Sequence, residues 1–74
     1  MKKFVELFKE ALEIENRELN MADEFRTYPE WSSLAFLSLI SMLDDEYGVV
    51  IETVEFRQLK TLQQLFDEIQ KRIG

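Results

Sequence analysis

Apolar residues recur at helical spacing in three separate segments of this 74-residue chain, and this pattern limits the fold more than any other feature. The second segment runs from Ser33 to about Tyr47, and the third begins at Leu62. No repeat or linker interrupts the chain, so we expect one all-α domain over residues 1–74. In the first segment, charged residues separate the apolar positions, which are Phe4, Leu7, Phe8, Ala11 and Leu12.

Residues that favour helix ends flank the second and third segments. Ser32 precedes the second segment and Gly48 follows it, as expected for an N-cap and a C-terminal stop. Thr61 and Gln64 have the spacing of a capping box at the start of the third segment. The third helix is expected to bury one apolar face, made of Leu62, Leu65, Phe66, Ile69 and Ile73.

The two remaining stretches lack a long helical period. Asn16 to Trp31 contains the only proline and several aromatic residues, so we expect a long loop that is held against the core. The β-branched run Val49–Ile51 has no strand to pair with, which favours an extended connection. A short helical turn over Thr53–Leu59 then places Val54 and Phe56 against the domain.

Composition excludes several classes of function. The chain has no cysteine and no histidine, which removes disulfides, thiol or imidazole nucleophiles and the usual transition-metal sites. Asp44 and Asp45 are adjacent and diverge on a helix surface, so they cannot flank one substrate as acid and base. We therefore expect no catalytic residue and no metal site.

The charge and the N-terminal sequence indicate the environment. A net charge of −6 has the wrong sign for nucleic acid, so basic protein surfaces are the expected partners. Met1 to Lys3 lead directly into an amphipathic segment, with neither a signal peptide nor a membrane span. We expect a monomer in the cytoplasm.

Ser33 is the candidate functional residue. It opens the most apolar helix, where backbone N–H groups and the positive end of the helix dipole favour an anion such as a phosphate ester. A second stripe of this helix combines apolar and polar residues, so some apolar surface is expected to face outward beside Ser33 and to receive a partner. This stripe consists of Leu34, Leu37, Ser38, Ser41 and Asp45.

Nearly the whole chain resembles the acyl carrier protein family, including its peptidyl and D-alanyl carrier relatives. Ser33-Leu34 match the Ser-Leu of the family's attachment motif, and Asp44–Tyr47 match its acidic stretch ending in an aromatic residue. The intervening apolar positions match at Leu39, Ile40 and Leu43. The resemblance implies a small bundle of three main helices plus one short helix, with a long first loop.

The resemblance also implies a function. A phosphopantetheinyl transferase would attach 4′-phosphopantetheine from coenzyme A covalently to Ser33. The thiol of this group would carry acyl or aminoacyl thioesters in fatty acid, polyketide, peptide or cell-envelope synthesis. A chain without cysteine can do thioester chemistry only through such an imported thiol. The protein would then be a carrier and not an enzyme.

Two groups of residues receive further roles. Acyl-loading and synthase enzymes with basic patches would dock on a surface comprising Leu34, Leu37, Ser38, Ser41, Asp44, Asp45, Glu52 and Glu55. In the family an acyl chain can be held in a pocket between the helices. The lining of such a pocket here would be Phe36, Leu39, Ile40, Leu43, Phe56, Leu59, Leu62 and Ile69. The bulk of Phe36 near its entrance would favour a short or polar cargo.

Ser32 departs from the motif, because the family usually has an aspartate at this position. Serine still caps the helix, but a negative charge beside the attachment site is lost, which implies slower modification or a dedicated transferase. One alternative from a different class remains open. The chain would then be a small acidic helical module that binds a basic partner without any modification.

Overall fold

The computed structural model describes residues 2–15 and 17–73, so Asn16, the first residue of the predicted loop, lies outside it together with Met1 and Gly74. The described residues contain no strand, and an isolated bridge joins Glu24 to Thr61. The predicted all-α fold of three main helices, one short helix and a long first loop is confirmed. Its elements are α1 (Lys2–Leu12), the 3-10 turn η1 (Phe25–Thr27), α2 (Ser33–Tyr47), α3 (Thr53–Phe56) and α4 (Leu62–Ile73).

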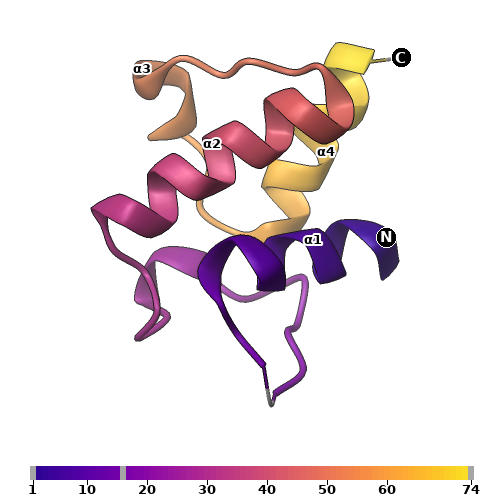
Figure 1. The fold of residues 1–74 in the computed structure, drawn as a ribbon. Coiled ribbons are helices and arrows are strands. Elements are labelled where there is room, and N and C mark those ends of the chain that lie inside the picture. Colours follow the sequence, from indigo (N-terminus) through magenta and orange to yellow (C-terminus); the bar gives the residue numbers. More distant parts are fainter. Residues whose placement is uncertain (1, 16, 74) are drawn as a thin grey trace.

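The three long helices surround one apolar core. In Figure 1, α1 lies along one side of α2 and α4 lies behind them, while α3 lies beside the N-terminal half of α2. Every element contributes at least one side chain to this core. The fully buried large side chains are Phe4, Phe8, Phe25, Phe56, Leu39, Leu43, Leu62, Leu65 and Ile69.

Both predicted ends of α2 are confirmed. The Ser32 hydroxyl oxygen accepts a hydrogen bond of 3.1 Å from the Ala35 N–H, which satisfies one of the unpaired donors of the first turn. Gly48 ends the helix in the left-handed region, with φ 64° and ψ 29°, and its N–H donates to the Asp44 carbonyl. Glycine adopts this conformation without a Cβ clash. The capping box of α4 also forms, with Gln64 N–H donating to Thr61 Oγ1 at 3.1 Å.

The end of α1 uses the same backbone conformation without glycine. Glu13 has φ 56°, and the following Ile14 N–H donates to the Lys9 carbonyl at 2.8 Å. This turn returns Ile14 to the core, where it is 5% exposed, although it lies beyond the helix.

The first loop is held down by side chains and by backbone hydrogen bonds. Phe25 is fully buried and its ring lies 6.0 Å from that of Phe8. The loop also pairs with the segment between α3 and α4, where Phe25 N–H donates to the Lys60 carbonyl, and with the first turn of α4, where Gln63 N–H donates to the Met21 carbonyl. Its placement therefore depends on residues more than thirty positions away along the chain.

Two residues expected in the core are exposed instead. Val54 is 69% exposed because α3 is a single turn, in which residues two positions apart point in nearly opposite directions, and Phe56 takes the inward position. Ile73 is 48% exposed at the last residue of α4. The extended connection before α3 alternates as a strand would, with Val49 and Ile51 buried and Val50 exposed.

Candidate functional site

Ser33 is the first residue of α2 and is exposed to solvent. The preceding Ser32 is extended, with φ −160° and ψ 174°, and it holds the start of the helix by the cap described above. The hydroxyl of Ser33 is thus presented at the positive end of a helix of 15 residues. This is a favourable position for an ester of phosphate.

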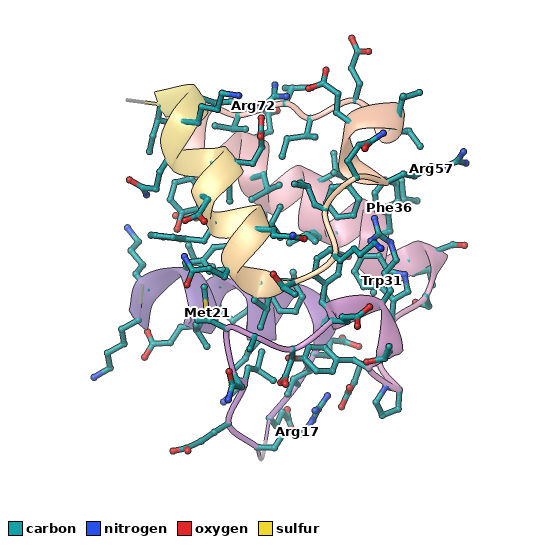
Figure 2. All side chains as sticks on the ribbon, turned by 180° about the vertical axis from the view of Figure 1, so that it is seen from behind. Arg17, Met21, Trp31, Phe36, Arg57 and Arg72 are labelled. Carbon is teal, nitrogen blue, oxygen red and sulfur yellow. The ribbon has the colours of Figure 1, made fainter. Side chains whose placement is uncertain are left out.

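An open pocket of about 450 Å³ lies beside Ser33, between the first loop, the start of α2 and α3. Figure 2 shows three of its residues, Trp31, Phe36 and Arg57, gathered on one side of the molecule. The pocket is built from segments that are far apart in the sequence. Its lining consists of Arg26, Trp31, Ser32, Ser33, Phe36, Thr53, Phe56 and Arg57.

Aromatic rings form one wall of this pocket. Trp31 stacks on Phe56 with ring centroids 6.2 Å apart and an interplanar angle of 6°. Phe36 meets the same Phe56 ring edge-on at 5.1 Å. Each of the three rings contacts the other two, since the ring centroids of Trp31 and Phe36 are also only 6.3 Å apart. The wall is therefore a packed cluster that an apolar ligand segment can lie against.

The charged residues of the pocket are both arginines. Arg26 Nη2 donates to the Phe56 carbonyl at 2.7 Å, and Arg26 Nη1 donates to the Leu59 carbonyl. Burial lowers the pKa of Arg26, and the neighbouring positive charge of Arg57 lowers it further. Among the described residues, none that lines the pocket carries a carboxylate. A local positive site thus lies next to Ser33 on a chain whose net charge is −6.

The residues expected to dock a partner are all exposed. Leu34 and Leu37 are 76% and 61% exposed, and they continue along α2 from Ser33. Of the acidic members, Glu55 forms an ion pair with Arg72 of α4. The structure spreads this set along α2, onto the segment that leads into α3 and onto α3 itself. The remaining exposed members are Ser38, Ser41, Asp44, Asp45 and Glu52.

The residues expected to line an acyl pocket fall into two groups. Phe36 and Phe56 line the open pocket beside Ser33. The other six do not line it: Ile40 and Leu59 are partly buried, and four are fully buried in the core, namely Leu39, Leu43, Leu62 and Ile69. The family role of these eight residues stays a prediction.

Sequence reasoning missed the two arginines of the pocket. Arg26 lies in the first loop and Arg57 directly after α3, and neither belongs to a motif. A weak signal exists, because each follows a buried phenylalanine, Phe25 or Phe56. Nothing in the spacing of these residues places them beside Ser33, since the fold alone brings the two segments together.

Residues 2–15 and 17–73 hold neither a metal-binding cluster of acidic residues nor a membrane-spanning helix. Within these ranges, no group of three or more acidic residues is arranged to hold a metal ion. The helices of the same ranges are all too short or too polar to cross a bilayer.

Both the sequence and the fold of this chain are similar to those of known proteins. A family model described as a phosphopantetheine attachment site matches residues 2–69. Among solved structures, the solution NMR structure of a holo acyl carrier protein from Geobacter metallireducens is similar, with a TM-score of 0.80 and 21% sequence identity. The match covers 95% of this chain and 80% of that one, and it shows a shared fold. No curated protein matches the sequence.

Proposed function

The chain belongs to the phosphopantetheine attachment family, and from this premise we propose that it is an acyl carrier protein with Ser33 as the attachment residue. The observation that carries the proposal is the exposed hydroxyl of Ser33 at the start of α2, on a fold shared with an acyl carrier protein. The adjacent Ser32 is occupied as the helix cap, which favours Ser33 over its neighbour.

The surroundings of Ser33 fit a phosphodiester. The helix dipole and the arginines of the adjacent pocket both favour a negative charge there. Attachment forms a bond between Ser33 Oγ and the phosphorus of coenzyme A that bears pantetheine. The bond from this phosphorus to adenosine 3′,5′-bisphosphate breaks, and the hydroxyl proton leaves to a base of the transferase.

The bound group supplies a flexible arm with a terminal thiol, on which acyl or aminoacyl cargo is carried as a thioester. The chain's own residues present this arm to partners. The exposed Leu34 and Leu37 offer apolar contacts beside the attachment point. Asp44 and Asp45, near the other end of α2, offer negative charge to the basic patches of synthase and acyl-loading enzymes.

The proposal gives the chain a carrier role, with the chemistry of loading and condensation done by its partners. Fatty acid, polyketide, peptide and cell-envelope synthesis are all compatible with it. A monomer acting in the cytoplasm stays the expectation from the sequence.

Intact mass spectrometry tests the proposal directly. The purified chain is incubated with coenzyme A, Mg²⁺ and a transferase of broad specificity, and the expected result is a mass gain of one phosphopantetheine. Ser33→Ala abolishes the gain, whereas Ser32→Asn retains it because asparagine keeps the helix cap without offering a hydroxyl. An unmodified wild-type chain would favour the alternative of an acidic interaction module that is never modified. A mass gain that persists in Ser33→Ala would overturn Ser33 as the attachment residue and assign the arm to another side chain.

A further inference from the structure

Arg57 differs from the other three arginines of the chain. Arg17 pairs with Glu30, and Arg26 donates to two carbonyl groups. Arg72 pairs with Glu55 and Glu68 and also donates to the Val50 carbonyl. Within the described residues, the Arg57 side chain forms no ion pair and donates no hydrogen bond. This is unexpected in a chain with 15 acidic residues and nine basic ones.

Arg57 lies beside the proposed attachment residue, since it lines the same pocket as Ser33. A positively charged side chain beside the attachment residue is complementary to an anion, the more so because no carboxylate lines the pocket in the part of the chain that the structure describes. Arg57 is exposed, so its guanidinium can reorient to meet a ligand without first breaking an ion pair.

The rest of the pocket suits an apolar segment next to that anion. Its volume of about 450 Å³ is far larger than a phosphate needs and lies within the ordinary range of small-molecule sites. Trp31 and Phe36 provide the aromatic wall described above, in direct continuity with Ser33 along the lining. The site therefore calls for a ligand that is anionic at one end and apolar beside it.

We propose that this pocket binds the near end of the prosthetic arm, with Arg57 pairing with the phosphodiester and Trp31 and Phe36 contacting the dimethyl-bearing segment that follows. This rests on Ser33 being the attachment residue. The phosphodiester is bonded to Ser33 itself, whereas any anion on the cargo lies at the far end of the arm. The phosphodiester thus reaches Arg57 without the arm folding back.

The docked arm has a functional consequence. Its first segment lies along α3, so the arm leaves the domain in a preferred direction. An exposed ion pair is weak and is screened by salt, so a partner with its own basic patch can compete for the phosphodiester and release the arm.

Trp31 provides the measurement, because it is the only tryptophan of the chain. Quenching of its fluorescence by acrylamide is compared between unmodified protein and protein whose mass gain has been verified. We expect the quenching constant to fall on modification of the wild type. In Arg57→Gln the quenching constant should not change on modification. In Lys60→Gln it should fall as in the wild type, because Lys60 is an exposed basic residue that does not line the pocket.

A third sample separates two sources of the anion. It is loaded by transfer from succinyl-coenzyme A, which adds a carboxylate at the far end of the arm. Protection of Trp31 in the protein modified with coenzyme A alone supports the phosphodiester as the ligand. Protection that appears only in the succinyl-loaded sample overturns that assignment in favour of the cargo.

The remaining outcomes are also decisive. Verified modification with no change in Trp31 quenching overturns the docked arm and leaves the carrier function intact. Equal loss of protection in Arg57→Gln and Lys60→Gln overturns the specific role of Arg57. Absence of any mass gain at Ser33 overturns the carrier function and the docked arm together.

Discussion

The two faces of α2 carry apolar residues for different reasons. One face packs Leu39 and Leu43 against the other helices, and both side chains are 0% exposed. The other face presents Leu34 and Leu37 to solvent at 76% and 61% exposure. A helix that folding alone had shaped would carry polar residues on its outer face. The comparison teaches that the apolar residues on one face of α2 stabilise the fold, whereas those on the other face are available for contacts with a partner.

The largest expected effect comes from the buried face. Leu39→Ala removes a fully buried side chain and leaves a cavity, so the free energy of unfolding should fall by about 2–5 kcal/mol. Urea denaturation followed by circular dichroism measures this loss. A loss below about 1 kcal/mol would show that the core refills the space and that the two faces differ less than their exposure indicates.

The N-terminal cap of α2 belongs to neither face and should rank second. Ser32→Ala removes the hydrogen bond to the Ala35 N–H, and we expect the free energy of unfolding to fall by about 1 kcal/mol.

Ser32→Asp keeps a cap of equal quality and places a carboxylate beside Ser33, so the free energy of unfolding should hold while modification by a transferase becomes faster. Equal modification rates for Ser32→Asp and the wild type would remove any role of that charge.

The acidic end of α2 should give a smaller effect of opposite sign. Asp44→Asn combined with Asp45→Asn removes negative charge near the C-terminal end of the helix dipole, so stability should rise by about 0.3–1 kcal/mol at low ionic strength. Association with a basic partner should become slower and less sensitive to salt. Stopped-flow kinetics at two salt concentrations measures this, and an unchanged association rate would assign these acids no docking role.

The smallest change in stability is expected on the exposed face. Leu37→Ser should alter the free energy of unfolding by no more than about 0.5 kcal/mol, because the side chain is already in water. The same variant should lower the rate of modification or of acyl loading. A loss of stability comparable to that of Leu39→Ala would break the distinction between the two faces, and an unchanged loading rate would show that the exposed face is not used.

The helices and their ends could be predicted because their causes are local. Apolar spacing, the Ser32 cap, Gly48 and the capping box at Thr61 and Gln64 all act within a few residues along the chain. The left-handed turn at Glu13 was not predicted, since glutamate has no intrinsic preference for positive φ. Tertiary packing of Ile14 selects it.

The sequence by itself determined the helical class, the position of Ser33 at the head of α2 and the family to which the chain belongs, since each depends on short spacings or on motif residues. Only the tertiary structure decided that Val54 turns outward, and that Arg26, Trp31 and Arg57 meet beside Ser33. The physical reason is distance along the chain. The pocket joins the first loop, α2 and α3, and no local preference of these segments encodes their mutual contact.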